Sequence, residues 1–351
     1  MNDHDVGVTQ RSSATPRIRD VATAAGVSYQ TVSRVLNDSP KVNSETRQHV
    51  LDVIAQLGYR PNRAARALGS GRSAAVTTVI ANTTLYGYAS TLQGIEEAAR
   101  VRGLAVGVRV VESASAADVQ HAVDYVSDPN AGGVIVIAFD AAGAGVLRAL
   151  PADVPAVAAT EAGGLDGIDR AMIFLDERAA AADATKHLLS LGHRTVHHVA
   201  IPSETGTSAR QAGWRDALVQ AGVAVPAVLA AGWDVRSAYL AGKGLATDPD
   251  VTAVLCGNDD TALAVRRALY EAGRDVPGDV SVVGFDDVPG AAYWTPALTT
   301  VRMDFVGLGR ACLTAIAARL TGSPLDALEL AAPSLVVRES TAPPRPRIGN
   351  N

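Results

Sequence analysis

The feature that most constrains the fold is an alternation of short apolar segments with amphipathic helical segments, which begins at Ala75 and continues to about residue 340. Strands that alternate with helices of roughly 10–15 residues form βαβ units, and their sheets are parallel. The apolar segments are nearly continuous, as expected for strands that helices cover on both faces. The sequence therefore predicts an α/β fold with doubly wound parallel sheets.

The expected strands fall into two sets, which favours two doubly wound lobes over one large sheet. The first set comprises residues 75–81, 104–110, 133–138 and 156–159, and the second comprises 172–175, 195–201, 251–256 and 280–284. The intervening helices are expected at 90–102, 116–126, 178–191, 208–221, 237–247 and 259–272. Such sheets bind ligands beyond the carboxyl ends of their strands, so two facing lobes predict a ligand cleft.

The charge of the chain is unevenly distributed. Residues 1–72 contain ten Lys and Arg against six Asp and Glu, a net charge of +4, whereas the remainder carries −9. A basic segment ahead of an acidic body favours a polyanionic partner such as nucleic acid for the basic segment.

Composition excludes several classes of protein. No apolar run reaches the ~18 residues of a membrane span, and the first residues lack the apolar core of a secretory signal. Cys256 and Cys312 are too few for a disulfide framework, which favours a reducing compartment. We therefore expect a cytoplasmic protein without a membrane partner, with residues 1–16 as a disordered lead-in.

Residues 17–60 have the pattern of three short helices. Gly26 separates the first two, Ser28 can cap the second, and Gly58 ends the third. The apolar positions at helical spacing are Ile18, Val21, Ala22 and Ala25 in the first helix and Val50, Ile54 and Leu57 in the third. Two helices joined by a tight glycine turn are typical of a helix-turn-helix, which places its second helix in the major groove of DNA.

The second helix carries polar residues suited to reading DNA. Tyr29, Gln30, Ser33 and Arg34 fall on its outer face. Gln can bond adenine and Arg can bond guanine in bidentate fashion, whereas hydroxyl and amide groups reach phosphates. The phosphate-contacting candidates are Ser28, Thr31, Ser33 and Asn37.

Residues 61–73 are expected to form a hinge. Pro61 and Gly69 delimit about seven helical residues, and so short a helix is marginal in water by itself. Such a segment can act as an order–disorder switch. A plain linker is the alternative.

The stretch from Arg19 to Asn37 resembles the headpiece of the LacI/GalR family of repressors. The resemblance implies that Tyr29, Gln30 and Arg34 read bases. It also implies that the hinge folds on DNA and inserts a leucine into the minor groove, and the matching positions here are Asn62, Ala64 and Leu68. Two heads of a homodimer would then bind the half-sites of a pseudo-palindromic double-stranded operator.

The resemblance continues through about residue 340 and implies periplasmic-binding-protein-like lobes over residues 74–340. Its markers include Leu191–Arg194, Gly257–Asp260, Asp279–Asp287 and Leu298–Val301. The matching sugar-contacting positions are Arg210, Asn258 and Asp286, with Trp233 as a stacking aromatic and Thr83 as a contact from the first lobe. Helix capping by Asn258 and a turn role for Asp286 are the alternatives, and Trp214 is expected to pack inside the lobe.

The functional prediction is a repressor whose operator affinity is controlled by a small carbohydrate, an inducer by family resemblance. The alternatives are a free sugar-binding protein of the periplasmic type and an α/β enzyme fused to a DNA-binding module. No cofactor, metal or catalytic residue is predicted: the run from Gly143 lacks the third glycine of a dinucleotide fingerprint, and His193 and His197 do not share a helix face. Residues 341–351 are expected to be a disordered tail that cannot form a heptad helix, which favours a dimer.

Overall fold

The computed structural model describes residues 16–36, 39–59, 75–128, 131–161, 165, 167–203, 208–325 and 327–346. The chain divides into two compact units, residues 1–73 and 74–351. Among the described residues, no helix combines the length and the apolar character that crossing a bilayer requires.

In its described residues, the first unit contains three helices around a small apolar core. They are α1 (Ile18–Ala24), α2 (Tyr29–Leu36) and α3 (Ser44–Leu57). Gly26 turns the chain between α1 and α2 with a positive φ of 63°, a conformation that costs glycine little. Val21, Val32 and Val50 are fully buried at the centre. The predicted core position Leu57 is wrong, because its side chain is 37% exposed and Val53 is buried instead.

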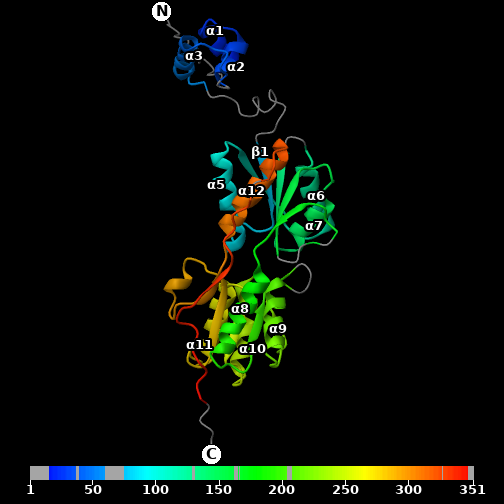
Figure 1. Cartoon of the computed structure of the whole chain (residues 1–351), viewed down its shortest axis with the longest axis vertical. Coiled ribbons are helices and arrows are strands. Elements are labelled where there is room, and N and C mark those ends of the chain that lie inside the picture. Colours follow the sequence, from blue (N-terminus) through cyan, green and yellow to red (C-terminus); the bar gives the residue numbers. More distant parts are fainter. Residues whose placement is uncertain are drawn as a thin grey trace, which may run out of the picture. The chain divides into compact units, whose positions relative to one another are not determined.

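The first lobe of the second unit is a five-stranded parallel sheet in the order β2-β1-β3-β4-β5 (Figure 1). Its strands are β1 (Ala75–Ile80), β2 (Ala105–Val110), β3 (Gly133–Ala138), β4 (Ala156–Thr160) and β5 (Ala171–Ile173). Its helices are α5 (Tyr86–Val101), α6 (Ala116–Val126), α7 (Ala141–Ala149) and α12 (Phe305–Thr321).

The second lobe is a six-stranded sheet in the order β11-β10-β9-β8-β6-β7, parallel except for β11. Its strands are β6 (His197–Ala200), β7 (Leu229–Ala230), β8 (Ala253–Cys256), β9 (Ser281–Asp286), β10 (Thr299–Arg302) and β11 (Ser334–Val336). Its helices are α8 (Glu177–Ser190), α9 (Ala209–Gln220), α10 (Val235–Thr247), α11 (Asp259–Glu271) and the 3₁₀ turn η2 (Ala291–Tyr293).

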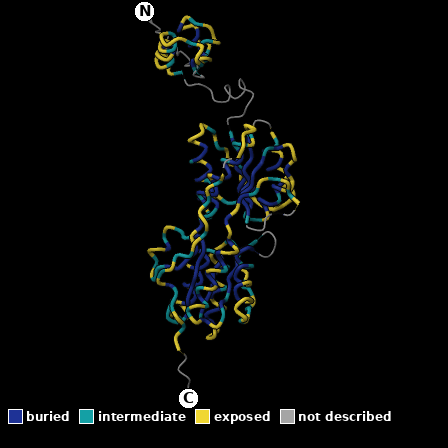
Figure 2. The backbone as a smooth tube through the Cα atoms, viewed as in Figure 1, coloured by how far each residue is buried: buried dark blue, intermediate teal, exposed yellow. Residues whose placement is uncertain are grey.

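Alternate strand residues bury against helices on opposite faces of each sheet, which explains the continuous apolar runs in the sequence. In β3, Ile135 and Ile137 pack with α5 and α12, whereas Val134 and Val136 pack with α6 and α7. The second lobe repeats this arrangement, with α8 and α9 on one face and α10 and α11 on the other. Figure 2 shows the central strands of each sheet, such as β3 and β8, as the buried centre of each lobe.

Helix α12 belongs to the first lobe although it follows the last parallel strand of the second. It packs against α5, as Figure 1 shows. A Cβ added to Gly94 of α5 would overlap the Val306 carbonyl oxygen, and one added to Gly309 of α12 would overlap the Thr91 carbonyl oxygen. Each helix therefore offers a glycine where the other helix's backbone passes, and any side chain there would separate the two.

The sequence prediction omitted α7, α12, β7, β10 and β11, although Leu298–Val301, which overlaps β10, was one of its markers of the family resemblance. It correctly placed Trp214 inside the second lobe, where the indole is fully buried and its Nε1 donates to the Val196 carbonyl oxygen at 2.9 Å. The expected disorder from residue 341 onward is wrong for 341–346. The Ala342 amide and carbonyl there bond the Ser281 hydroxyl, and Arg345 pairs with Asp275 and Asp279.

Candidate functional site

Helix α2 presents a polar outer surface, as its residue spacing predicts. Its buried residues are Val32 and Val35, which face α1 and α3. On the opposite side, Gln30 and Arg34 are exposed, and Tyr29 is 54% exposed although it is a large aromatic residue. An exposed Tyr, Gln and Arg on one face supply hydrogen-bond donors and acceptors suited to the edges of bases.

Ser28 and Thr31 lie at the start of α2. The Ser28 hydroxyl accepts from the Thr31 amide at 3.1 Å and lies 2.9 Å from the Thr31 hydroxyl. Ser28 therefore caps the helix, and Ser33 is half-buried one turn further along. The other predicted DNA-contacting residues, Asn37, Asn62, Ala64 and Leu68, lie outside the described residues, as does the predicted hinge.

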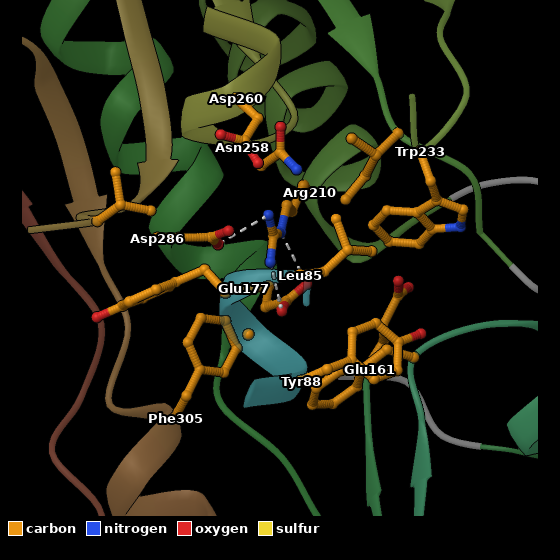
Figure 3. Close-up of a pocket in the computed structure, with 15 residues that line it drawn as sticks. Leu85, Tyr88, Glu161, Glu177, Arg210, Trp233, Asn258, Asp260, Asp286 and Phe305 are labelled. Carbon is orange, nitrogen blue, oxygen red and sulfur yellow. Dashed lines mark hydrogen bonds and ion pairs between the residues drawn. The ribbon is translucent and has the colours of Figure 1, made fainter. Parts of the chain in front are cut away.

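A pocket lies at the carboxyl ends of the strands of both lobes (Figure 3). Each of its lining segments follows a strand, because parallel strands of a doubly wound sheet end at one edge. The lining residues that follow strands of the first lobe are Leu85, Tyr86, Gly87, Tyr88, Phe139, Glu161 and Glu177. Those that belong to the ends of second-lobe strands are Ile201, Arg210, Trp233, Asn258, Asp260, Asp286, Val288 and Phe305.

Arg210, near the start of α9, is at the centre of the pocket. Its Nε and Nη2 donate to the two carboxylate oxygens of Glu177, both at 3.1 Å, and its Nη1 lies 3.2 Å from Asp286 Oδ1. Nη1 also donates to the Gly257 carbonyl oxygen, and the guanidinium stacks on Phe285 with its carbon 4.2 Å from the ring centroid. Although burial opposes its charge, the two carboxylates raise the pKa of Arg210, which keeps it cationic.

Asp286, the last residue of β9, projects its carboxylate into the pocket from a strained turn. Its φ is 112° and that of Asp287 is 54°, both unusual for residues other than glycine. Asp287 pairs with Arg302 and Arg338, and the buried Asp259 accepts from the Val288 amide at 2.8 Å. These contacts hold the turn, and burial raises the pKa of Asp286 well above its usual value.

Glu161 follows β4 on the side of the pocket opposite Asp286 (Figure 3). Burial, together with the charge of Glu177, raises the pKa of Glu161 to about 7. It accepts hydrogen bonds from the Ser203 side chain and the Ala209 backbone. Glu161 therefore changes its charge near neutral pH while its partners are neutral groups.

Five aromatic side chains line the pocket. The Tyr88 ring meets Phe139 and Trp233 edge to face, with centroids 5.2 and 6.3 Å apart. Its hydroxyl donates to Asp140 at 2.5 Å, so its polar end has a partner. Tyr86 and Phe305 complete the set, with centroids 6.2 Å apart. Aromatic faces of this kind cover the apolar face of a sugar ring.

The pocket is small in this conformation. Its empty space is about 540 Å³ when the open mouth is included, but the enclosed cavity is only about 40 Å³, which corresponds to a few water molecules at most. A sugar would therefore enter only if side chains or lobes move apart.

The structure brings together four of the five ligand-binding candidates: Arg210, Trp233, Asn258 and Asp286. Asn258 both lines the pocket and caps α11, because its Oδ1 accepts from the Thr261 amide at 2.8 Å. Thr83 is exposed and does not line the pocket. The prediction missed Tyr88, Phe139, Glu161, Glu177, Asp260 and Phe305. Position in the sequence could have revealed two of them, since Phe139 directly follows an expected strand and Glu161 lies two residues after the end of another.

A helix-turn-helix unit followed by two doubly wound lobes with a polar pocket defines a DNA-binding transcriptional regulator with a periplasmic-binding-protein-like domain. Comparison with known proteins agrees. Residues 17–62 match the bacterial regulatory proteins of the lacI family, and residues 185–341 match the periplasmic binding protein-like domain. The chain belongs to the lacI family.

The similarity covers nearly the whole chain. The chain is 31% identical to the lactose operon repressor of Escherichia coli K12 over 332 residues, which are 93% of this chain and 90% of that protein. A lac repressor dimer bound to operator and the anti-inducer ONPF matches with a TM-score of 0.83 and 30% identity, over 94% of this chain and all of that one. The regulator CelR in complex with cellobiose matches with a TM-score of 0.68 and 30% identity, over 93% and 99% of the two chains.

Proposed function

We propose that this chain is a homodimeric repressor whose affinity for a pseudo-palindromic operator is controlled by a small carbohydrate in the pocket. The observation that carries the proposal is the position of Arg210, Asn258, Asp286 and Trp233 at one edge of two sheets. Carboxylate, amide and guanidinium groups bond paired hydroxyls, while aromatic faces cover ring carbons. The relatives named above include a repressor of a lactose operon and a cellobiose complex.

On the DNA side, Tyr29, Gln30 and Arg34 read base edges from the exposed face of α2. Ser28, Thr31, Ser33 and Asn37 contact phosphates, and the hinge of residues 61–73 places Asn62, Ala64 and Leu68 at the minor groove. The exposure of Tyr29, Gln30 and Arg34 supports this assignment for the described residues. Two copies are required because each head reads one half-site.

On the ligand side, the carbohydrate acts as an inducer. A ligand changes DNA affinity only if it binds the two conformations of the protein with different affinity. The pocket offers such a difference, because its enclosed space of about 40 Å³ cannot accept a sugar without rearrangement. The pocket binds its ligand without transforming it, and the protein acts in the cytoplasm, where the DNA is.

The proposal is tested by measuring binding to operator DNA with and without sugars. The operator is first selected from random duplexes, and its affinity is followed by fluorescence anisotropy at fixed salt, because phosphate contacts make affinity salt-dependent. We expect a specific duplex, with affinity that falls when the correct sugar is added. An Asp286→Asn variant should bind the operator normally but lose the response. Affinity that no carbohydrate alters would refute ligand control, and failure to select any duplex would refute DNA recognition.

A further inference from the structure

The pocket carries an excess of negative charge. Its described lining residues include four carboxylates, Glu161, Glu177, Asp260 and Asp286, but a single basic residue, Arg210. When every group is ionised, the lining has a net formal charge of −3. Buried charges of one sign are costly, which raises the pKa values of Glu161 and Asp286, and a cation bound among these carboxylates would relieve that cost.

Arg210 has little capacity left for a ligand. Two of its nitrogens serve both oxygens of Glu177, and the third serves Asp286 and the Gly257 carbonyl. A carbohydrate acid or a sugar phosphate would therefore find no free positive charge among the described lining residues and would meet the remaining carboxylates. The charge of the lining disfavours an anionic ligand.

Three carboxylates have unused acceptor capacity. Asp286 Oδ1 is buried and accepts no hydrogen bond from any described residue. Asp260 forms no hydrogen bond or ion pair with the part of the chain that the structure describes. Among the described residues, the neutral Ser203 and Ala209 groups donate hydrogen bonds to Glu161. Burial and the charge of Glu177 raise its pKa more than the charge of Arg210 lowers it, and a nearby cation would relieve the repulsion.

The aromatic residues are concentrated in the same place. Aromatic residues make up 4% of the chain, yet five line this pocket. Glu161 lies on the same side as Tyr88 and Trp233, whose ring centroids are 6.3 Å apart (Figure 3). A carboxylate next to aromatic faces is a combination that binds an ammonium group, by charge and by cation–π attraction.

We propose that the effector is an amino sugar, a carbohydrate whose protonated amine sits between the Glu161 carboxylate and the rings of Tyr88 and Trp233. The proposal rests on the proposed carbohydrate-binding function, and it narrows the ligand to carbohydrates that carry a positive charge. The hydroxyls of the sugar are then left for Asp286, Asp260 and Asn258.

The test uses the full-length protein and sugars that differ at one substituent. Binding is measured by titration calorimetry at pH 7 for glucose, 2-amino-2-deoxyglucose, 6-amino-6-deoxyglucose and glucuronic acid, and for the same series built on galactose. We expect an amine to bind at least roughly tenfold more tightly than the hydroxyl sugar of its series, and the acid to bind most weakly. A hydroxyl or carboxylate sugar that binds as tightly as the amines overturns the inference but leaves the proposed function standing. Absence of binding by every carbohydrate overturns both.

Two variants test whether the Glu161 carboxylate causes the preference for an amine over a hydroxyl. Glu161→Gln keeps the size of the side chain and removes its charge, so the preference for amine over hydroxyl should fall to within about twofold. Glu112→Gln, at an exposed position after β2, is the matched control and should keep the full preference. Circular dichroism will check that both variants are folded. An amine preference that survives in Glu161→Gln contradicts the placement of the ammonium.

Discussion

The Arg210 guanidinium and the Glu177 carboxylate meet in two parallel hydrogen bonds of 3.1 Å, and each side chain is only 8% exposed. Such a buried pair stabilises a fold only while both partners are present, because a lone buried charge is costly. Since Asp286 shares the same guanidinium, removing Arg210 would leave two carboxylates unpaired.

We therefore predict that Arg210→Met lowers the free energy of unfolding by about 3–5 kcal/mol. The matched control is Arg178→Met, which breaks an ion pair with Asp216 whose side chains are 60% and 51% exposed. This exposed pair should contribute no more than about 1 kcal/mol. Urea denaturation of both variants provides the comparison. Similar losses in the two variants would show that Arg210 is not needed to neutralise the carboxylates.

The second prediction concerns the exposed face of α2. Gln30→Ala should abolish discrimination at one base pair of each half-site, a loss of about 1–3 kcal/mol for the preferred base. Arg47 of α3 is a basic residue of the same unit that we expect to contact phosphates, so Arg47→Ala should weaken binding to every sequence alike, because phosphate contacts carry no base information. Anisotropy titrations against single-base operator variants separate the two effects. Unchanged selectivity in Gln30→Ala would exclude this residue from base reading.

The third prediction concerns His198, which is fully buried against Trp214 with ring centroids 5.3 Å apart. Burial lowers the pKa of His198 to about 4 from the ordinary 6.5. Between these values the unfolded chain binds a proton that the folded chain does not, so this residue's contribution to stability falls as the pH drops from 6.5 to 4. The total loss amounts to about 3 kcal/mol.

His198→Phe removes this titration. The difference in unfolding free energy between wild type and variant should then change with pH in that window and level off above pH 7. Urea denaturation at several pH values measures this difference and cancels the contributions of other titrating groups. A constant difference from pH 7 to pH 4 would contradict a neutral buried imidazole.

The fourth prediction uses two helical glycines in different surroundings. Gly309→Ala should destabilise the protein by roughly 1–3 kcal/mol or more, because the added methyl would overlap the Thr91 carbonyl oxygen of α5. Gly244→Ala in α10 has nothing within 4 Å of the new methyl and should stabilise by up to about 1 kcal/mol. Thermal unfolding of both variants shows whether each substitution raises or lowers the melting temperature. Equal shifts would mean that α5 and α12 can separate freely.

The sequence correctly predicted those helices, strands and turns that are specified by the pattern of neighbouring residues. The apolar runs of β1 and β3 and the glycine turn at Gly26 depend on neighbouring residues, and the structure has them where they were expected. Helix α12 was missed because glycines and apolar residues occur around its whole circumference. Nine of its residues are buried, from Phe305 to Ile316, so it lacks the polar face that marks an amphipathic helix.

The sequence predicted only some of the residues that line the pocket, because others depend on residues far away in the sequence. Arg210, Asn258 and Asp286 could be found because they match sugar-contacting positions of the family. The role of Glu177 could not be inferred from its neighbours in sequence, since it depends on Arg210, a residue 33 positions away. Thr83 does not line the pocket, because the chain turns after β1 and presents Leu85 and Tyr86 to it instead.

The late position of α12 has a consequence for synthesis. The first four strands of the first lobe leave the ribosome before residue 161, but α12, one of the two helices that cover one face of their sheet, begins only at Phe305. Until then that face is covered by α5 but not by α12, so Ile135 and Val157 lack part of their packing. Because β6 to β10 are complete by Arg302, the parallel strands of both lobes are synthesised before this helix. A chain whose synthesis stops near residue 300 would therefore expose part of an apolar sheet face in its first lobe.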